Sequence, residues 1–497
     1  MAESVSFGAV NYLVLSVYLV GMIWIGVATA GKQKTTRDFF LAGRNVPWLA
    51  VAMSVFATIT SAISYMGTPG LVYKENISTF IGILVMPVVA PFIIVLFLPF
   101  YQRMEVTTSY EYIFRRFGAP ARYAVSVLFL CARLGWLGTV IYAPALALAV
   151  VTGIPIVLSI VIMGVLSTVY TFLGGMTAVI WTDVAQFLIL VGGAVIVALA
   201  LIVGVPGGVG EILRVSGAAG RLNLLEWWPS LTHMTIPAVA LSYFLQFMHD
   251  YGADQLTVQR LLAAKDYKGM VRATAMNAVF TVVIMGILTF IGLGLFAYYQ
   301  MEGHALPKDL AADRIFPYYV VHTLPAGISG LVIAAVFAAA MSSVSSGLNS
   351  LATVTIRDFI QPLRRVQRSD AEDLKLARAI TLGFGVFALG IAFFVSRIAE
   401  IMKASQTFLG LFSGPVLALF LLGMLTRRAS FRGWLAGVLV AIPGTIYVQN
   451  QTDVHFIYYF PISFGIALIF GLLVSFVLPS RPVDPALTVW GSSGTEV

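Results

Sequence analysis

The sequence predicts an all-α polytopic membrane protein. Of its 497 residues, 59% are hydrophobic and only 10% are charged, whereas about 25% of the residues in a typical soluble domain are charged. The apolar residues gather in runs of about 20 residues, which are long enough to cross a bilayer as helices. We count about thirteen such runs, and basic residues alternate between the segments that join them.

The connecting segments predict the orientation in the bilayer. Most of the 30 Lys and Arg residues fall in every second segment. Because cytoplasmic loops are enriched in these residues, we expect a plasma (inner) membrane protein with its N-terminus outside and its C-terminus in the cytoplasm. The ninth span is too long for one crossing and is expected to begin with a turn outside the membrane. The predicted spans are 7–30, 46–68, 78–101, 121–150, 154–175, 181–205, 235–257, 271–299, 317–356, 376–397, 402–425, 431–448 and 457–479.

Several classes of function are excluded by composition and motifs. The single cysteine, Cys131, excludes an intrachain disulfide and a cysteine metal cluster. The sequence has no phosphate-binding loop, no nucleophile elbow and no paired His or Cys ligands, so an enzyme is not expected. The net charge of +8 lies mainly in the connecting segments and does not predict nucleic-acid binding. The first residues lack the basic region of a cleaved signal peptide.

The second span is unusually polar at its centre. Thr58, Thr60, Ser61 and Ser64 lie near mid-membrane depth, and Gly67-Thr68-Pro69-Gly70 follows. A helix that breaks there would expose carbonyl and amide groups to a ligand. The alternative is ordinary helix packing, with each hydroxyl bonded to a carbonyl of its own helix.

Ionisable side chains also fall inside predicted spans. Arg133 lies in the fourth span and Asp250 in the seventh, next to His249, so Arg133 and Asp250 are a possible charge pair. Ionisable groups at this depth mark functional sites by default, although an arginine can also extend its charged end to the interface. Asp183 opens the sixth span, where its plainest role is to cap the helix. His249 lacks a nearby second metal ligand of the His or Cys type, so a metal site is not expected.

A cluster of serines lies in the ninth span. Ser342, Ser345, Ser346 and Asn349 share one face of a helix, and Ser343 lies beside that face. Such hydroxyls can supply oxygen ligands to Na⁺. Small and hydroxyl residues are also common at the packing faces of membrane helices, and the residues alone favour this second interpretation.

The interrupted spans suggest an internal repeat. The eleventh span is interrupted by Ser413-Gly414-Pro415, and the second span is interrupted at its polar centre. Two such interruptions are typical of inverted-repeat transporters with a site at the membrane midplane. The expected organisation is a first repeat at 46–205, an extracellular loop at 206–234 and a second repeat at 235–425. Segments 1–45 and 426–497 would then be accessory.

Taken together, these stretches resemble the sodium:solute symporter family over nearly the whole chain. The matching stretches, in order, are Val55–Thr58, Ser109–Phe117, residues 170–186, Asp254–Arg260 and the serine cluster. The resemblance implies a LeuT-type fold of five plus five helices within about thirteen transmembrane helices. It also implies a sodium site formed by the carbonyls of Ala57, Thr60 and Ala339 and the hydroxyls of Ser342 and Ser343. Some members have a second sodium site, whose matching residues here are Asp183, Ser342, Ser345 and Ser346.

The resemblance carries less information about the transported solute. The sugar branch has an asparagine and a tyrosine on the seventh span where this chain has Phe247 and Asp250. The sialic-acid branch has an arginine on the fourth span where this chain has Trp136. Residues 138–148 are similar to the iodide, monocarboxylate and vitamin branch, so a small anion such as a monocarboxylate is expected. The expected solute contacts are Ser61, Ser64, Trp136, Phe247 and Gln406.

The sequence therefore predicts a Na⁺-coupled symporter that imports a small solute by alternating access, with Na⁺, the solute and the lipid bilayer as its partners. The alternatives are a sialic acid or sugar symporter and a proton-coupled transporter of the same fold, in which Asp250 and His249 relay the proton. A membrane sensor is a further class, but the chain offers no output domain after its last span.

Overall fold

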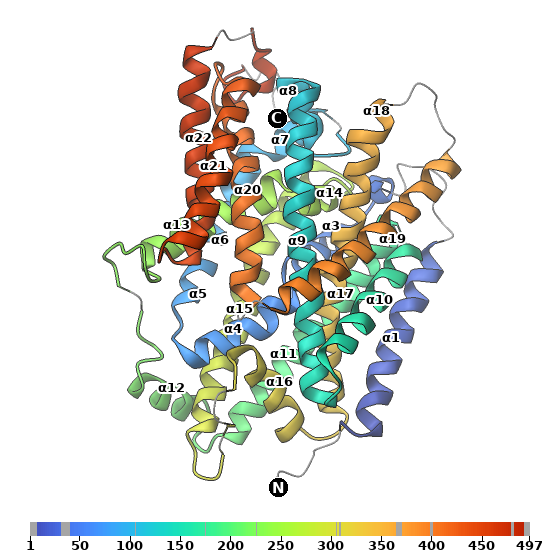
Figure 1. Cartoon of the computed structure of the whole chain (residues 1–497). Helices are drawn as coiled ribbons and strands as arrows, with labels where there is room; N and C mark the ends of the chain where they lie inside the picture. Colours follow the sequence, from blue (N-terminus) through green and yellow to red (C-terminus); the bar gives the residue numbers. More distant parts are fainter. Residues whose placement is uncertain are drawn as a thin grey trace.

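The structure, a computed structural model, is a bundle of helices. It describes residues 7–30, 40–104, 106–173, 175–224, 226–304, 306–307, 310–363, 370–397, 401–478 and 482–491, which contain no strand and one isolated bridge between Val46 and Ala264. Figure 1 shows the long helices side by side, with α1 at one edge and α21 and α22 at the other. In chain order the elements are α1 (Ala9–Ala30), η1 (Ala42–Arg44), α3 (Trp48–Ile59), α4 (Ala62–Lys74), α5 (Ser78–Ile83), α6 (Met86–Leu96), α7 (Leu98–Met104), α8 (Tyr110–Phe117), α9 (Ala119–Thr152), α10 (Ile156–Leu173), α11 (Met176–Gly204), α12 (Gly208–Ala218), α13 (Ile236–Met248), η2 (His249–Ala253), α14 (Gln255–Leu261), α15 (Tyr267–Tyr299), α16 (Ala312–Thr323), α17 (Ile328–Val354), η3 (Thr355–Ile360), α18 (Gln361–Leu363), α19 (Asp370–Val395), α20 (Ile401–Leu425), α21 (Phe431–Gln451), η4 (Phe456–Tyr458), α22 (Tyr459–Val477) and η5 (Pro485–Leu487).

The expected thirteen spans are not confirmed. Among the described residues, ten helices are long and apolar enough to cross a membrane, and the bent pair α3–α4 makes an eleventh. The expected fifth span corresponds to α10, in which the described residues include the apolar segment Ile156–Thr168. The expected seventh span is divided, because α13 ends after 13 residues and continues as the π-helical turn η2. Polar residues of this turn, His249 and Asp250, interrupt the apolar run.

The helices α17 and α9 form the centre of the bundle. In α17, 89% of the apolar window is buried, against 28% in α1, α19 and α22. The helix packs against α11, α9, α1 and α3. A Cβ atom at Gly347 would lie 2.7 Å from Leu137 of α9, so small residues let these backbones approach closely. The hydroxyls of α17 therefore face neighbouring helices and not lipid.

The second span breaks at its polar centre, as expected, but the eleventh span does not break at Ser413–Pro415. The second span bends by 61° between α3 and α4, at Thr60–Ser61, while Gly67–Gly70 continues α4. The segment Ser413–Pro415 lies inside an unbroken α20. Its glycine serves packing instead, because a Cβ atom at Gly414 would lie 2.7 Å from the amide nitrogen of Phe464 in α22. The expected turn at the start of the ninth span separates α16 from α17, where Gly327 has a φ of 88°.

Candidate functional site

The break between α3 and α4 frees main-chain carbonyls at the centre of the bundle. In a continuous helix, the amide of Ser61 would donate to the carbonyl of Ala57. Here it donates to Ile59 O at 3.1 Å. The carbonyls of Ala57 and Thr58 therefore lack their helical partners, and Ser61 starts α4 by accepting a hydrogen bond at its side chain.

Two serines of α17 meet these carbonyls. Ser342 Oγ donates to Ala57 O at 2.7 Å, and Ser343 Oγ donates to Thr58 O at 2.8 Å. Each hydroxyl also lies 3.2 Å from Ala339 O, and both serines are fully buried. Five neutral oxygens from α3 and α17 thus form one cluster. Backbone carbonyls and hydroxyls of this kind can replace the hydration shell of an alkali cation.

This cluster contains four of the five residues expected at the first sodium site. Thr60, the fifth, lies at the helix break and lines the neighbouring cavity. Thr58 contributes a carbonyl that the sequence did not predict. Which carbonyls are freed depends on the position of the break, and no residue type marks that position.

The second expected sodium group surrounds a buried ion pair. Asp183 Oδ2 accepts hydrogen bonds from Ser54 Oγ at 2.6 Å and Thr58 Oγ1 at 3.4 Å, and Arg260 lies 3.4 Å away. Thr58 Oγ1 lies 2.9 Å from Ser346 Oγ, to which Arg260 also donates. Asp183 is not a helix cap, because α11 begins at Met176 and carries Asp183 in its interior.

One oxygen of this carboxylate has no partner among the described residues. It is Asp183 Oδ1, which is buried. Ser345 joins the group indirectly, by donating to Ser342 O at 3.1 Å. Arg260 follows the expected seventh span, 235–257, where a basic residue usually marks the inner interface. Its charge already balances that of Asp183, so a cation bound here would meet a neutral pair.

A cavity beside the helix break contains every residue expected to contact the solute. It is enclosed mainly by α4, α9, α13 and α20. Gln406 Nε2 of α20 donates to Gln246 Oε1 of α13 at 3.0 Å, which joins two walls of the cavity. Gln406 Oε1 is buried and has no partner among the described residues. The expected residues in its lining are Ser61, Ser64, Trp136, Phe247 and Gln406, and the lining also includes Arg133 and Asp250.

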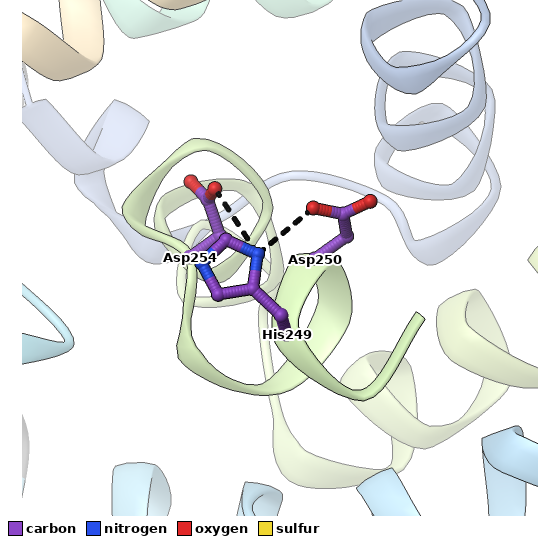
Figure 2. Close-up of side chains that lie close together, drawn as sticks. All are labelled: His249, Asp250 and Asp254. Carbon is purple, nitrogen blue, oxygen red and sulfur yellow. Dashed lines mark hydrogen bonds and ion pairs between the residues drawn. The ribbon is translucent and has the colours of Figure 1, made fainter. Parts of the chain in front are cut away.

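Figure 2 shows His249, Asp250 and Asp254, and Asp250 of this group lines the cavity. Arg133 NH2 lies 3.3 Å from Asp250 Oδ1 and forms an ion pair with Asp254 as well. His249 Nδ1 lies 3.0 Å from Asp250 Oδ1. The guanidinium of Arg133 also lies over the ring of Trp136, 4.9 Å from its centroid. The sequence marked Arg133 and Asp250 as a possible pair but did not indicate Asp254, which follows the unforeseen π-helical turn.

The three residues of Figure 2 also have the composition of a metal site. Their ligand atoms lie within 4.8 Å of one another. Arg133 contacts both carboxylates, however, and so supplies the positive charge that a metal would bring. A second cation in the same place would be repelled. The arrangement fits an ion-pair network better than a metal centre.

Another cavity lies close to the one beside the helix break, since Thr68 and Gly67 of α4 line one each. This second cavity shares α4 and α20 with the first, and further involves α16, α21 and the segment 452–456. Several charged residues line this second cavity, among them Lys74, Asp313 and Lys403. This polar cavity is called the vestibule.

Buried hydrogen bonds join the helices at the opposite end of the site. Gln255 of α14 accepts from the amide of Ser109 at 2.8 Å. Asp358 of η3 accepts from Thr108 Oγ1 at 3.0 Å and from Ser126 Oγ of α9 at 2.9 Å. All five side chains are buried. These contacts connect α14 to the start of α8, and they connect η3 to α9.

Comparison with known proteins gives one consistent family. The model of the sodium:solute symporter family matches residues 39–441. The sodium/sialic acid symporter NanT of Aliivibrio fischeri is 33% identical over 95% of this chain and 94% of its own. The sodium-coupled monocarboxylate transporter 2 of Mus musculus is 31% identical over 90% of this chain and 74% of its own. A solved substrate-bound, outward-open Na⁺-coupled sialic acid symporter, whose description reports a novel Na⁺ site, superposes with a TM-score of 0.90 at 32% identity, covering 96% of this chain and 100% of its own.

Proposed function

Because the chain belongs to the sodium:solute symporter family, we propose that it imports a hydroxylated solute of the sialic-acid or sugar class together with Na⁺. The protein is a multi-pass membrane transporter coupled to Na⁺, and it is not an enzyme. The similarity to sodium/sialic acid symporters over almost the whole of both chains favours this solute class. The monocarboxylate expected from residues 138–148 has less support.

The acceptor oxygens in the lining of the cavity are the observation that carries this choice. Arg133 also lines the cavity, but it is already paired with Asp250 and Asp254. Any carboxylate, whether of a small monocarboxylate or of sialic acid, would have to compete with these two for the charge of Arg133, so this charge does not separate the two solute classes. Asp250 and Gln406 instead offer acceptor oxygens, which suit a solute rich in hydroxyl donors.

The oxygen cluster of α3 and α17 is the proposed main sodium site. Ala57, Thr58, Ala339, Ser342 and Ser343 would hold the ion, with Thr60 nearby at the break. Because the cluster needs both helices, Na⁺ would favour the form in which they lie at this separation, and so couple to transport. A second ion would use Asp183 Oδ1 with Ser342, Ser345 and Ser346, and would bind more weakly beside Arg260.

The five-plus-five repeat is part of the same proposal. The breaks at Thr60–Ser61 and at η2 fall in the first helices of the two proposed repeats, 46–205 and 235–425. Paired interruptions of this kind support an inverted repeat of the LeuT type. The proposed orientation places the N-terminus outside, so that the vestibule beside α4 and α16 opens outwards and the described form faces outwards.

Uptake into proteoliposomes tests the proposed function. N-acetylneuraminic acid, galactose, lactate, pyruvate and iodide are offered with and without an inward Na⁺ gradient. We expect Na⁺-driven uptake of N-acetylneuraminic acid or galactose. Na⁺-driven uptake of lactate, pyruvate or iodide alone would overturn the solute class, and uptake driven by a proton gradient without Na⁺ would favour the relay through His249 and Asp250.

A further inference from the structure

The carboxylate of Asp250 differs from the other members of its cluster in its accessibility. Its side chain is 23% exposed, whereas the side chains of Arg133, His249 and Asp254 are 5%, 3% and 0% exposed. Asp250 also lines the solute cavity, and Asp254 does not. The cluster thus presents one partly accessible carboxylate to that cavity.

The two oxygens of Asp250 have different surroundings. Oδ1 receives Arg133 NH2 at 3.3 Å and lies 3.0 Å from His249 Nδ1. No described residue donates to Oδ2, which points away from His249 in Figure 2. An ionised carboxylate oxygen accepts hydrogen bonds and cannot donate them. Oδ2 therefore needs water or a donor group of a ligand.

The pairing of Arg133 does not require Asp250 alone. Asp254, fully buried, also forms an ion pair with Arg133, and its other oxygen accepts from Leu256 N at 2.8 Å at the start of α14. Both oxygens of Asp254 therefore have partners within the protein, Arg133 for one and the amide of Leu256 for the other. Arg133 carries one positive charge and can neutralise only one of the two carboxylates. Of the two, Asp250 is the one that lines the cavity.

We propose that Asp250 Oδ2 accepts a hydrogen bond from a hydroxyl group of the solute, which makes Asp250 a specificity-determining residue of the transport site. This inference rests on the proposed function, because it deepens the choice of a hydroxylated solute. Asp250 would then reject analogues that lack the partner hydroxyl, since its desolvated oxygen would be left without a donor.

The substitution Asp250→Asn gives a sharp test. Arg133 can only donate, so the asparagine oxygen should take the place of Oδ1 and its NH2 group the place of Oδ2. The position then changes from an acceptor to a donor, while Asp254 still pairs with Arg133. Asp254→Asn is the matched control, because it makes the same chemical change in the same cluster outside the cavity lining.

The experiment measures binding of N-acetylneuraminic acid and its 4-, 7-, 8- and 9-deoxy analogues by thermal stabilisation in saturating Na⁺. In the unmodified protein, we expect one analogue to bind about 10- to 100-fold more weakly than the parent, as for loss of a hydrogen bond to a charged group. Asp250→Asn should weaken binding of the parent by a similar factor. It should also abolish the difference in affinity between the parent and that analogue. Asp254→Asn should lower thermal stability and keep the difference. Stabilisation by Na⁺ alone shows that each variant is folded.

Three results would overturn the inference. If Asp250→Asn retains the full discrimination among the analogues, another residue binds the hydroxyl. If the unmodified protein binds all the analogues as tightly as the parent, none of these hydroxyl groups donates a hydrogen bond to Asp250. Should Asp250→Asn fail to fold, Asp250→Glu keeps the acceptor and should keep the same preferred analogue. Stabilisation by Na⁺ without binding of any analogue or of galactose would reject the solute class, and the inference with it.

Discussion

Substitution of Ser343 by alanine tests the proposed sodium site most directly. The side chain is fully buried in α17, and its hydroxyl is one of two that meet the carbonyls freed by the helix break. Ser343→Ala removes this oxygen and leaves the smallest possible gap. We expect weaker Na⁺ binding, with uptake restored at high Na⁺ concentration.

The size of the expected change in Na⁺ affinity follows from the contacts of Ser343 without Na⁺ and with Na⁺. Without Na⁺, Ser343 Oγ bonds to Thr58 O at 2.8 Å and lies 3.2 Å from Ala339 O. Losing a neutral hydrogen bond costs about 1 kcal/mol, and losing a contact with a charged group costs about 1.5–3 kcal/mol. The difference, about 0.5–2 kcal/mol, falls on Na⁺ binding. At about 1.4 kcal/mol per tenfold, the half-saturating Na⁺ concentration should rise about 2- to 30-fold.

The assay is uptake of N-acetylneuraminic acid, or of whichever solute is transported, across a series of Na⁺ concentrations, with thermal stabilisation by Na⁺ in parallel. Ser329→Ala is the matched control. Ser329 is also buried in α17 and bonds to main-chain carbonyls, at Val320 and Leu324, both at 2.9 Å. It lies 14 residues away, about 21 Å along the helix. Equal Na⁺ dependence in the Ser343→Ala and Ser329→Ala variants would refute the assignment of Ser343 as a ligand.

The remaining predictions concern buried carboxylates outside the solute cavity. Asp183→Asn leaves Arg260 without its buried counter-charge and should destabilise the protein by about 3–5 kcal/mol; the double variant with Arg260→Met should lose less than the sum of the two single losses, as measured by denaturation. Additive losses would contradict direct pairing. Asp358→Asn replaces one acceptor of Thr108 and Ser126 by a donor, and should loosen the end of the bundle opposite the vestibule by about 1–3 kcal/mol. Amide hydrogen exchange should then become faster in η3 and at the start of α8 but not in α22. Unchanged exchange rates in all three elements would show that this network does not stabilise that end of the bundle.

Sequence reasoning located the serines of α17 because helix periodicity alone places Ser342, Ser346 and Asn349 on one face. It named Ser64 and Gln406 as expected solute contacts, and the fold brings them to one cavity. It anticipated the break at the polar centre of the second span, but it also predicted one at Ser413–Pro415, where α20 is continuous. Glycine and proline mark both interruptions and close packing, and in this chain the packing of neighbouring helices decided between them.

The missed residues have a common physical reason. The carbonyl of Thr58 becomes available only because the helix ends two residues later, and any residue type would expose the same atom. Arg260 lies beyond an expected span, but the π-helical turn η2 and the short helix α14 carry it back into the bundle. Asp254, which lies inside the expected seventh span, becomes a partner of Arg133 because the same turn precedes it. The position of each of these residues depends on a local break in α-helical hydrogen bonding, which the periodicity of the sequence does not predict.

The helix break also explains how ion and solute can influence each other. The carbonyls of Ala57 and Thr58 on one side of the break meet α17, and Ser61 on the other side lines the solute cavity and caps α4. An ion held by those carbonyls fixes the end of α3, and with it the direction in which α4 leaves the break. A solute that contacts α4 then binds a form already selected by Na⁺. Because such coupling is reciprocal, the solute must strengthen Na⁺ binding by the same factor. The Thr60–Ser61 segment, which belongs to neither helix, would therefore be the element whose conformation both ligands affect.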